Sequence, residues 1–121
     1  MTEAVFVGPD SSSQLDSVIA ELKSEASHTR NRDAARTLLK APDLRIVVVA
    51  IHRDGVIPEH TANGTVSIHA LSGGVEVRLP SQTVQLAKGS LLVIPSRVAH
   101  EVTATEDSVF LLTLGWNQQA A

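Results

Sequence analysis

The hydrophobic pattern of the chain changes once, near residue 37, and the change separates two kinds of structure. Before it, apolar residues recur at helical spacing on an otherwise polar segment, and they are Leu15, Val18, Ile19 and Leu22. A single apolar stripe predicts an amphipathic helix over about residues 14–26, with its apolar side packed on the rest of the protein. We expect this helix to cover one face of the structure that follows; a lid or a dimer arm is the alternative.

A basic segment joins the two parts of the chain. Residues 28–36 hold three arginines together with Asp33. A basic patch for an anionic ligand is one interpretation, but charged runs are usually solvated, and we expect an exposed connection. The chain is therefore divided into an N-terminal arm and helix over residues 1–36, a strand-rich region over 37–116 and a C-terminal tail over 117–121.

From residue 37 onward the apolar positions either alternate or form short continuous runs. Residues 65–71 and 75–79 alternate, whereas 46–51, 91–94 and 109–114 are apolar on both faces. About seven or eight short strands separated by turn residues predict an all-β sandwich or barrel. Strands that are apolar on both faces need an outer cover, which the helix or a second subunit would supply. We therefore expect a homodimer.

Composition narrows the range of functions. The 121 residues are 43% hydrophobic, which predicts one packed domain. A net charge of −3, with only two phenylalanines and one tryptophan, argues against nucleic acid as a partner. The absence of cysteine fits a reducing cytoplasm. No apolar run reaches the roughly 18 residues of a membrane span, so we expect a cytoplasmic protein with no membrane partner.

Two histidines follow strand patterns that glycine and proline interrupt. Gly89 begins a turn, residues 91–94 are apolar, Pro95 ends the run and His100 comes five residues later. His60 follows the sequence Gly-Val-Ile-Pro-Glu. Histidines on separate strands of a closed sheet can reach one interior site, so we expect the two to share a pocket. A pair that only bonds to itself through water is the alternative.

These motifs resemble those of the cupins, a superfamily of small β-barrels, over residues 37–114. Five residues keep the cupin spacing, and they are Gly89, Pro95 and His100 of the second motif and His60 and Gly73 of the first. The resemblance implies a cupin-type jelly-roll β-barrel, here with an added N-terminal α-helix. It also implies a pocket for a small molecule inside the barrel.

The first cupin motif is degenerate in this chain. Cupins that bind a metal hold it with three histidines and a glutamate, but Ala62 stands at the second histidine position and Val66 at the glutamate position. His60 and His100 supply two donors, and a firmly held first-row metal usually has three or four. His69 is the candidate third ligand, although strand alternation turns it outward unless a bulge reverses the parity.

Two functions follow, and both stay open from the sequence alone. The first is binding of a small organic ligand in the barrel pocket at His60 and His100, with no established reaction. The alternative is a metal-dependent enzyme of the oxygenase, isomerase or lyase type. In that alternative, His60 and His100 are joined by His69 or His52 around zinc, iron, manganese or nickel. The replacement of two metal donors by apolar residues favours the first function.

Overall fold

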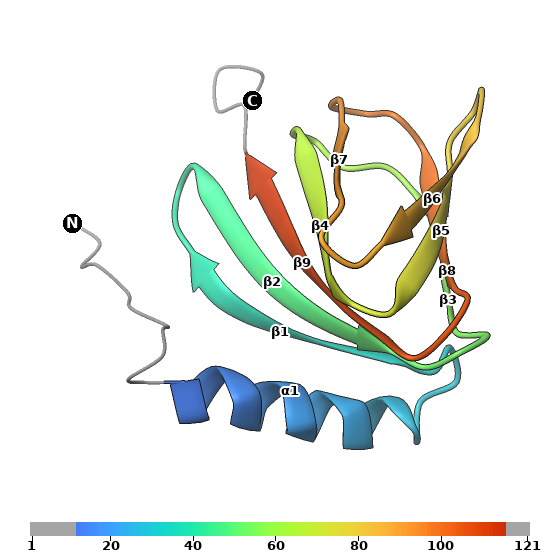
Figure 1. The fold of residues 1–121 in the computed structure, drawn as a ribbon. Coiled ribbons are helices and arrows are strands. Elements are labelled where there is room, and N and C mark those ends of the chain that lie inside the picture. Colours follow the sequence, from blue (N-terminus) through green and yellow to red (C-terminus); the bar gives the residue numbers. More distant parts are fainter. Residues whose placement is uncertain (1–11, 116–121) are drawn as a thin grey trace.

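The computed structural model describes residues 12–115, which form a helix followed by a barrel of antiparallel strands (Figure 1). The helix α1 spans Ser12–Ala26. The strands are β1 (Asp33–Lys40), β2 (Leu44–Ile51), β3 (Val56–His60), β4 (Val66–Ser72), β5 (Gly74–Arg78), β6 (Thr83–Ala87), β7 (Leu91–Ile94), β8 (His100–Ala104) and β9 (Ser108–Gly115). Within these residues, no helix combines the length and the apolar composition needed to cross a bilayer.

Two antiparallel sheets face each other and enclose the core. One has the strand order β1-β2-β9-β4-β7 and the other has the order β3-β8-β5-β6. Strands that are distant in sequence, such as β2 and β9, are therefore neighbours, as in a jelly roll (Figure 1). The predicted all-β jelly-roll barrel with an N-terminal helix is confirmed.

The first strand begins earlier than the hydrophobic pattern predicts. β1 starts inside the segment 28–36, which was expected to be an exposed connection. Arg36 of this strand forms ion pairs with Glu21 at 3.4 Å and Glu25 at 3.2 Å, both on α1. Leu38 packs beneath the same helix. The expectation was wrong for residues 33–36 because Arg36 is paired with the helix and not with solvent alone, which conceals the start of the strand in the sequence.

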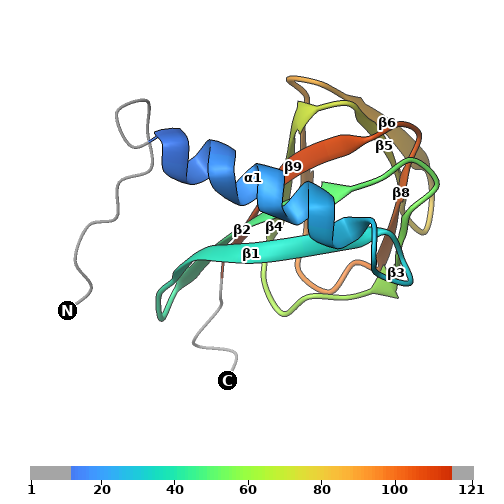
Figure 2. The ribbon, with the colours of Figure 1, turned by 90° about the horizontal axis from the view of Figure 1, so that it is seen from below.

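Helix α1 lies on the outer face of the five-stranded sheet (Figure 2). Its Leu22 is fully buried against Val48 and Ala50 of β2 and Val109 of β9. Alternation sends the other residues of β2 and β9 into the barrel, so these strands are apolar on both faces. The helix therefore supplies the outer cover that the two-faced strands need.

The barrel interior is filled at one end and hollow at the other. At the filled end, Val49 and Ile51 are buried in a continuous apolar core. Further along the same strands, Val47 and Leu112 face a pocket instead. We call these regions the filled end and the open end. The open end is where the two motif histidines lie.

A tight turn closes the filled end. Gly73, between β4 and β5, has a φ of +74°, a conformation that residues with a side chain rarely adopt. A Cβ at this position would collide with the backbone oxygen of Asp107 and the hydroxyl of Ser108. Only glycine therefore allows the β4–β5 turn to lie directly against the β8–β9 turn.

Candidate functional site

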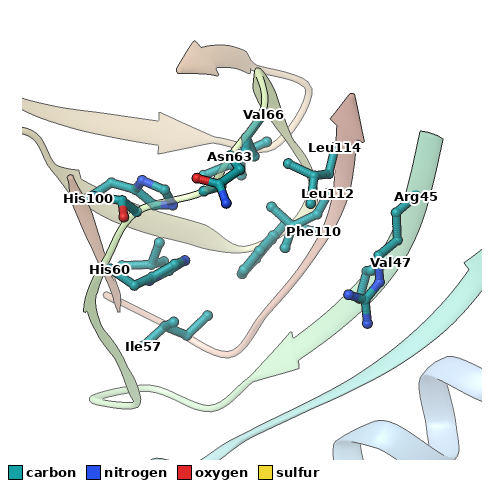
Figure 3. Close-up of a pocket in the computed structure, with 14 residues that line it drawn as sticks. Arg45, Val47, Ile57, His60, Asn63, Val66, His100, Phe110, Leu112 and Leu114 are labelled. Atoms are coloured by element: carbon teal, nitrogen blue, oxygen red, sulfur yellow. The ribbon is translucent and has the colours of Figure 1, made fainter. Parts of the chain in front are cut away.

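The fold brings His60 and His100 together, as their motif spacing predicts. They end β3 and begin β8, and the ladder between these strands places them directly opposite each other. Their ring centroids are 4.3 Å apart, with the ring planes inclined at 61° (Figure 3). His100 is only 3% exposed, whereas His60 lies at the rim of the pocket and is exposed.

The two rings make the same hydrogen bond to the backbone. Nδ1 of His60 lies 2.9 Å from the carbonyl oxygen of Pro58, and Nδ1 of His100 lies 3.0 Å from that of Val98. A carbonyl oxygen only accepts, so each Nδ1 carries the proton and donates. Each neutral ring is then left with an unprotonated Nε2. In the neutral form, each ring therefore offers a lone pair at Nε2 and no second donor.

Burial favours the neutral form of His100. Loss of hydration lowers the pKa of His100 below its usual range, the hydrogen bond to Val98 raises it in part, and neighbouring His60 lowers it further. His100 is therefore an uncharged imidazole at neutral pH.

The pocket at the open end has a volume of about 480 Å³ and mostly apolar walls. Strands β2, β4, β8 and β9 supply most of the walls, and the segment after His60 forms part of the rim (Figure 3). The lining residues are Arg45, Val47, Ile57, His60, Thr61, Ala62, Asn63, Val66, Ile68, His100, Val102, Phe110, Leu112 and Leu114. This size falls within the range of roughly 300–1,000 Å³ that is usual for small-molecule sites.

Arg45 is a pocket residue that the sequence analysis missed. It lies on β2 across the pocket from the two histidines (Figure 3). Its Nη2 donates to the hydroxyl of Thr37 at 3.3 Å, but its buried Nε has no hydrogen-bond partner. A buried N–H without an acceptor costs about 1–3 kcal/mol. The sequence did contain one indication of this position. Arg45 lies two and four residues before Val47 and Val49 on an otherwise apolar strand, so its side chain is on the same, inward face.

The positions that replace cupin metal donors do face the pocket. Ala62 and Val66 both line it and supply only carbon atoms there. His69 lies outside the set of lining residues, because strand alternation turns it to the outer face of β4, where it pairs with Leu91 and Leu111. His69 therefore does not join the histidine pair. Within residues 12–115, no group of three or more His, Cys, Asp or Glu side chains is arranged to hold a metal.

His52 belongs to a different constellation at the filled end. Its Nε2 lies 2.9 Å from the hydroxyl of Ser27, and its Nδ1 lies 3.4 Å from a carboxylate oxygen of Asp107. This order of groups resembles a hydrolytic triad. However, Nε2 also lies 2.7 Å from the carbonyl oxygen of Lys23 and must donate to it, so it cannot accept the serine proton. The contacts instead attach the end of α1 to the barrel.

The loop before His100 is tied to the segment after His60. The backbone N–H of Arg97 donates to the carbonyl oxygen of Ala62 at 2.9 Å. Arg97 has a φ of 67°, in the left-handed region that favours glycine. This backbone hydrogen bond holds together the two segments that carry His60 and His100 at the rim of the pocket.

Comparison with known proteins identifies the architecture. No family model and no curated protein matches the sequence. The structure is similar to a conserved protein of unknown function from Streptococcus pyogenes, with 27% identity, a TM-score of 0.69, and coverage of 74% of this chain and 79% of that one.

Other similar structures are described as cupins. A cupin superfamily protein from Desulfitobacterium hafniense has 16% identity and a TM-score of 0.70, with 76% of this chain and 87% of that chain covered. An RmlC-like cupin from Shewanella frigidimarina has 14% identity and a TM-score of 0.66, with 73% and 79% covered. At such identities the likeness establishes the fold, and it agrees with the motif spacing around His60 and His100. This chain is therefore a small protein of the cupin fold.

Proposed function

We propose that the protein binds a small organic ligand in the pocket at the open end, with His60 and His100 as polar contacts. The observation that carries the proposal is the pair of adjacent imidazoles at one side of an apolar pocket of about 480 Å³. Small-molecule sites typically combine apolar walls with a few convergent polar groups. No reaction is part of this proposal.

The hydrogen bonds of the two rings support an external partner. Because both Nδ1 atoms donate to backbone carbonyls, the Nε2 atoms of the neutral rings are both acceptors. Two acceptors cannot bond to each other, so the pair needs a donor from outside or a cation. A hydroxyl or another donor group of a ligand meets this need, and a bridging water alone would leave the rest of the pocket unused.

A metal-dependent enzyme of the oxygenase, isomerase or lyase type is the second candidate. A histidine whose Nδ1 donates to a backbone carbonyl presents Nε2 to a metal, which is a common arrangement at zinc, iron, manganese and nickel sites. The pocket supplies two such nitrogens, and the neighbouring Ala62 and Val66 supply no donor. A firmly held ion usually has three or four protein ligands, so this donor set does not complete a metal site.

The two candidates can be separated with protein that carries no affinity tag. We expect a fragment screen to contain compounds that raise the melting temperature of the wild type, by mass action on the folded state. The same compounds should have no effect on a His60→Ala/His100→Ala variant. His69→Ala is the matched control, since this histidine lies on the outer face and should leave the response intact.

Elemental analysis of the same samples tests the alternative. A stoichiometric transition metal that is present in the wild type and in His69→Ala, but lost from His60→Ala/His100→Ala, would favour the metal-dependent enzyme. A screen in which no compound stabilises the wild type would count against the ligand-binding proposal.

We also propose that the protein forms a homodimer in the cytoplasm. Leu91 and Val93 on β7 are 62% and 56% exposed, and β7 is an edge strand of the five-stranded sheet. An exposed apolar edge favours pairing, and a second copy offers the same edge in a two-fold arrangement. Sedimentation at tens of micromolar should give a dimer, and Leu91→Glu/Val93→Glu should give a folded monomer. A wild-type monomer would contradict the proposal.

A further inference from the structure

The pocket holds a permanent cation that the histidine pair does not explain. Arg45 belongs to the inward-facing row of β2 and lines the pocket together with Val47 (Figure 3). The figure places it on the opposite side from His60 and His100. A guanidinium stays protonated in proteins, so this side of the pocket is always positive.

Unlike Arg36 and Arg78, Arg45 forms no ion pair with an acidic side chain of the described residues. Arg36 pairs with glutamates of α1, and Arg78 pairs with Glu101 at 3.3 Å. The hydrogen bond from Arg45 goes to the neutral hydroxyl of Thr37, and its buried Nε donates to nothing. The guanidinium therefore keeps donor capacity for another molecule.

The surroundings of Arg45 increase the preference for an anion. The residues that line the pocket include no aspartate or glutamate, so a bound anion would meet no repelling carboxylate. Lys40 of β1 lies directly opposite Arg45 in the strand ladder. Two like charges at such a position are unfavourable unless an anion or solvent compensates them.

We propose that the ligand of this pocket is a small organic carboxylate whose acid group binds Arg45. This inference rests on the proposed function and adds the chemical class of the ligand. A guanidinium forms two parallel hydrogen bonds to a carboxylate, and the only side-chain hydrogen bond that Arg45 makes within the described residues is the one from Nη2 to Thr37. The carbon chain or ring of the acid then lies against Phe110, Leu112 and Leu114.

The same residues favour a carboxylate over a phosphate ester. A carboxylate has one charge and two oxygens, which a single guanidinium satisfies. A phosphate adds charge and oxygen atoms, and the walls beside Arg45 are mostly carbon, so these atoms would be buried without partners. A hydroxyl at the far end of the acid would reach the unprotonated Nε2 atoms of His60 and His100.

Matched pairs of probes test the charge requirement directly. Hexanoate and benzoate are titrated into labelled protein beside hexanamide and benzamide, which have the same shape without the charge. Backbone amide shifts of the pocket residues report binding. We expect each acid to bind at least about tenfold more tightly than its amide, and added salt to weaken only the acids.

Variants at Arg45 assign the effect to this side chain. Arg45→Met should remove the preference for the acids while the amides bind as in the wild type. Arg45→Lys, which keeps the charge but not the planar fork, should restore only part of the preference. Arg78→Met is the matched control, because this arginine lies away from the pocket and should leave all four affinities unchanged.

The possible failures are distinguishable. Amides that bind the wild type as tightly as the acids would overturn the inference and leave the ligand-binding function standing. Acids that keep their advantage in Arg45→Met would also overturn it. If neither the acids nor the amides perturb the pocket amides, the inference falls, and the fragment screen decides the proposed function separately.

Discussion

The two ends of the barrel use the same strands for different purposes. At the filled end, Ile51 and Val49 of β2 are buried against the opposite sheet. Two and four residues before Val49, the inward positions of β2 hold Val47 and Arg45, which line a pocket instead. One strand therefore contributes apolar core at one end and the wall of a pocket at the other. The comparison shows that the packed core and the pocket occupy separate halves of the same sheet.

The segments that connect the strands also differ between the two ends of the barrel. At the filled end, Gly73 lets two turns lie in direct contact. At the open end, the segments after His60 and before His100 are joined by the hydrogen bond from Arg97 to Ala62 at the rim of the pocket. Two turns in contact close the barrel at one end, whereas the pocket of about 480 Å³ lies at the other.

The largest expected effect comes from adding a methyl group at the filled end. Gly73→Ala should destabilise the protein by more than about 3 kcal/mol, since it combines an unfavourable φ with a collision against neighbouring backbone. The matched control is Gly89→Ala, where φ is +87° but nothing lies within 4 Å of the added Cβ. Its cost should be only about 1–2 kcal/mol. Urea unfolding measures both.

Equal losses in the two glycine variants would show that the turns at the filled end are not in contact. A loss in Gly73→Ala that is no larger than the strain alone would have the same meaning.

Truncation of one side chain at each end should give unequal effects. Ile51→Ala leaves a cavity in the packed core and should cost about 2–5 kcal/mol. Leu114→Ala removes carbon atoms from the wall of a pocket that solvent can already enter, so we expect a loss of about 1 kcal/mol. Thermal and urea unfolding of both variants check the difference. A loss in Leu114→Ala that equals that of Ile51→Ala would mean that the open end is packed as tightly as the filled end.

The smallest expected effect is the dependence of stability on pH that His100 causes at the open end. Burial lowers the folded-state pKa of His100, so the unfolded chain binds more protons than the folded one just below the ordinary histidine pKa of about 6.5. The contribution of His100 to the free energy of unfolding is therefore complete above about pH 6.5, and it is lost as the pH falls through the folded-state pKa. Urea unfolding at several pH values should show this decline in the wild type.

The decline should be weaker in His100→Asn, and His28→Asn serves as the exposed control. An NMR titration of the His100 ring should give a midpoint below that of an unstructured peptide. A midpoint at or above the peptide value would contradict the buried environment of this ring.

Local patterns in the sequence predicted those helices and strands whose own apolar spacing or turn residues mark them. The continuous apolar run 91–94 coincides with β7, and the apolar stripe from Leu15 to Leu22 lies within α1. The spacing of glycine and proline around His60 and His100 predicted that these residues meet, and they are direct cross-strand partners. In each case the signal lies within about a dozen residues of chain.

Other features depended on partners that are distant in the sequence. The start of β1 was missed because Arg36 looks like a solvated charge until Glu21 and Glu25 on α1 are placed beside it. His52 was a candidate metal ligand in the alternative function, but its contacts come from α1 and the β8–β9 turn. Neither the spacing of apolar residues along the chain nor the composition predicts contacts of this kind.

By itself, the sequence determined an all-β barrel, its covering helix and the meeting of two imidazoles. These features follow from the spacing of apolar residues and from turn residues, both of which can be recognised within short stretches of the chain. Only the tertiary structure decided which end of the barrel is hollow and which polar groups face the cavity. That choice depends on how side chains from β2, β4, β8 and β9 meet across the interior. Arg45 is the clearest case, since its charge becomes part of a pocket only when those strands close around it.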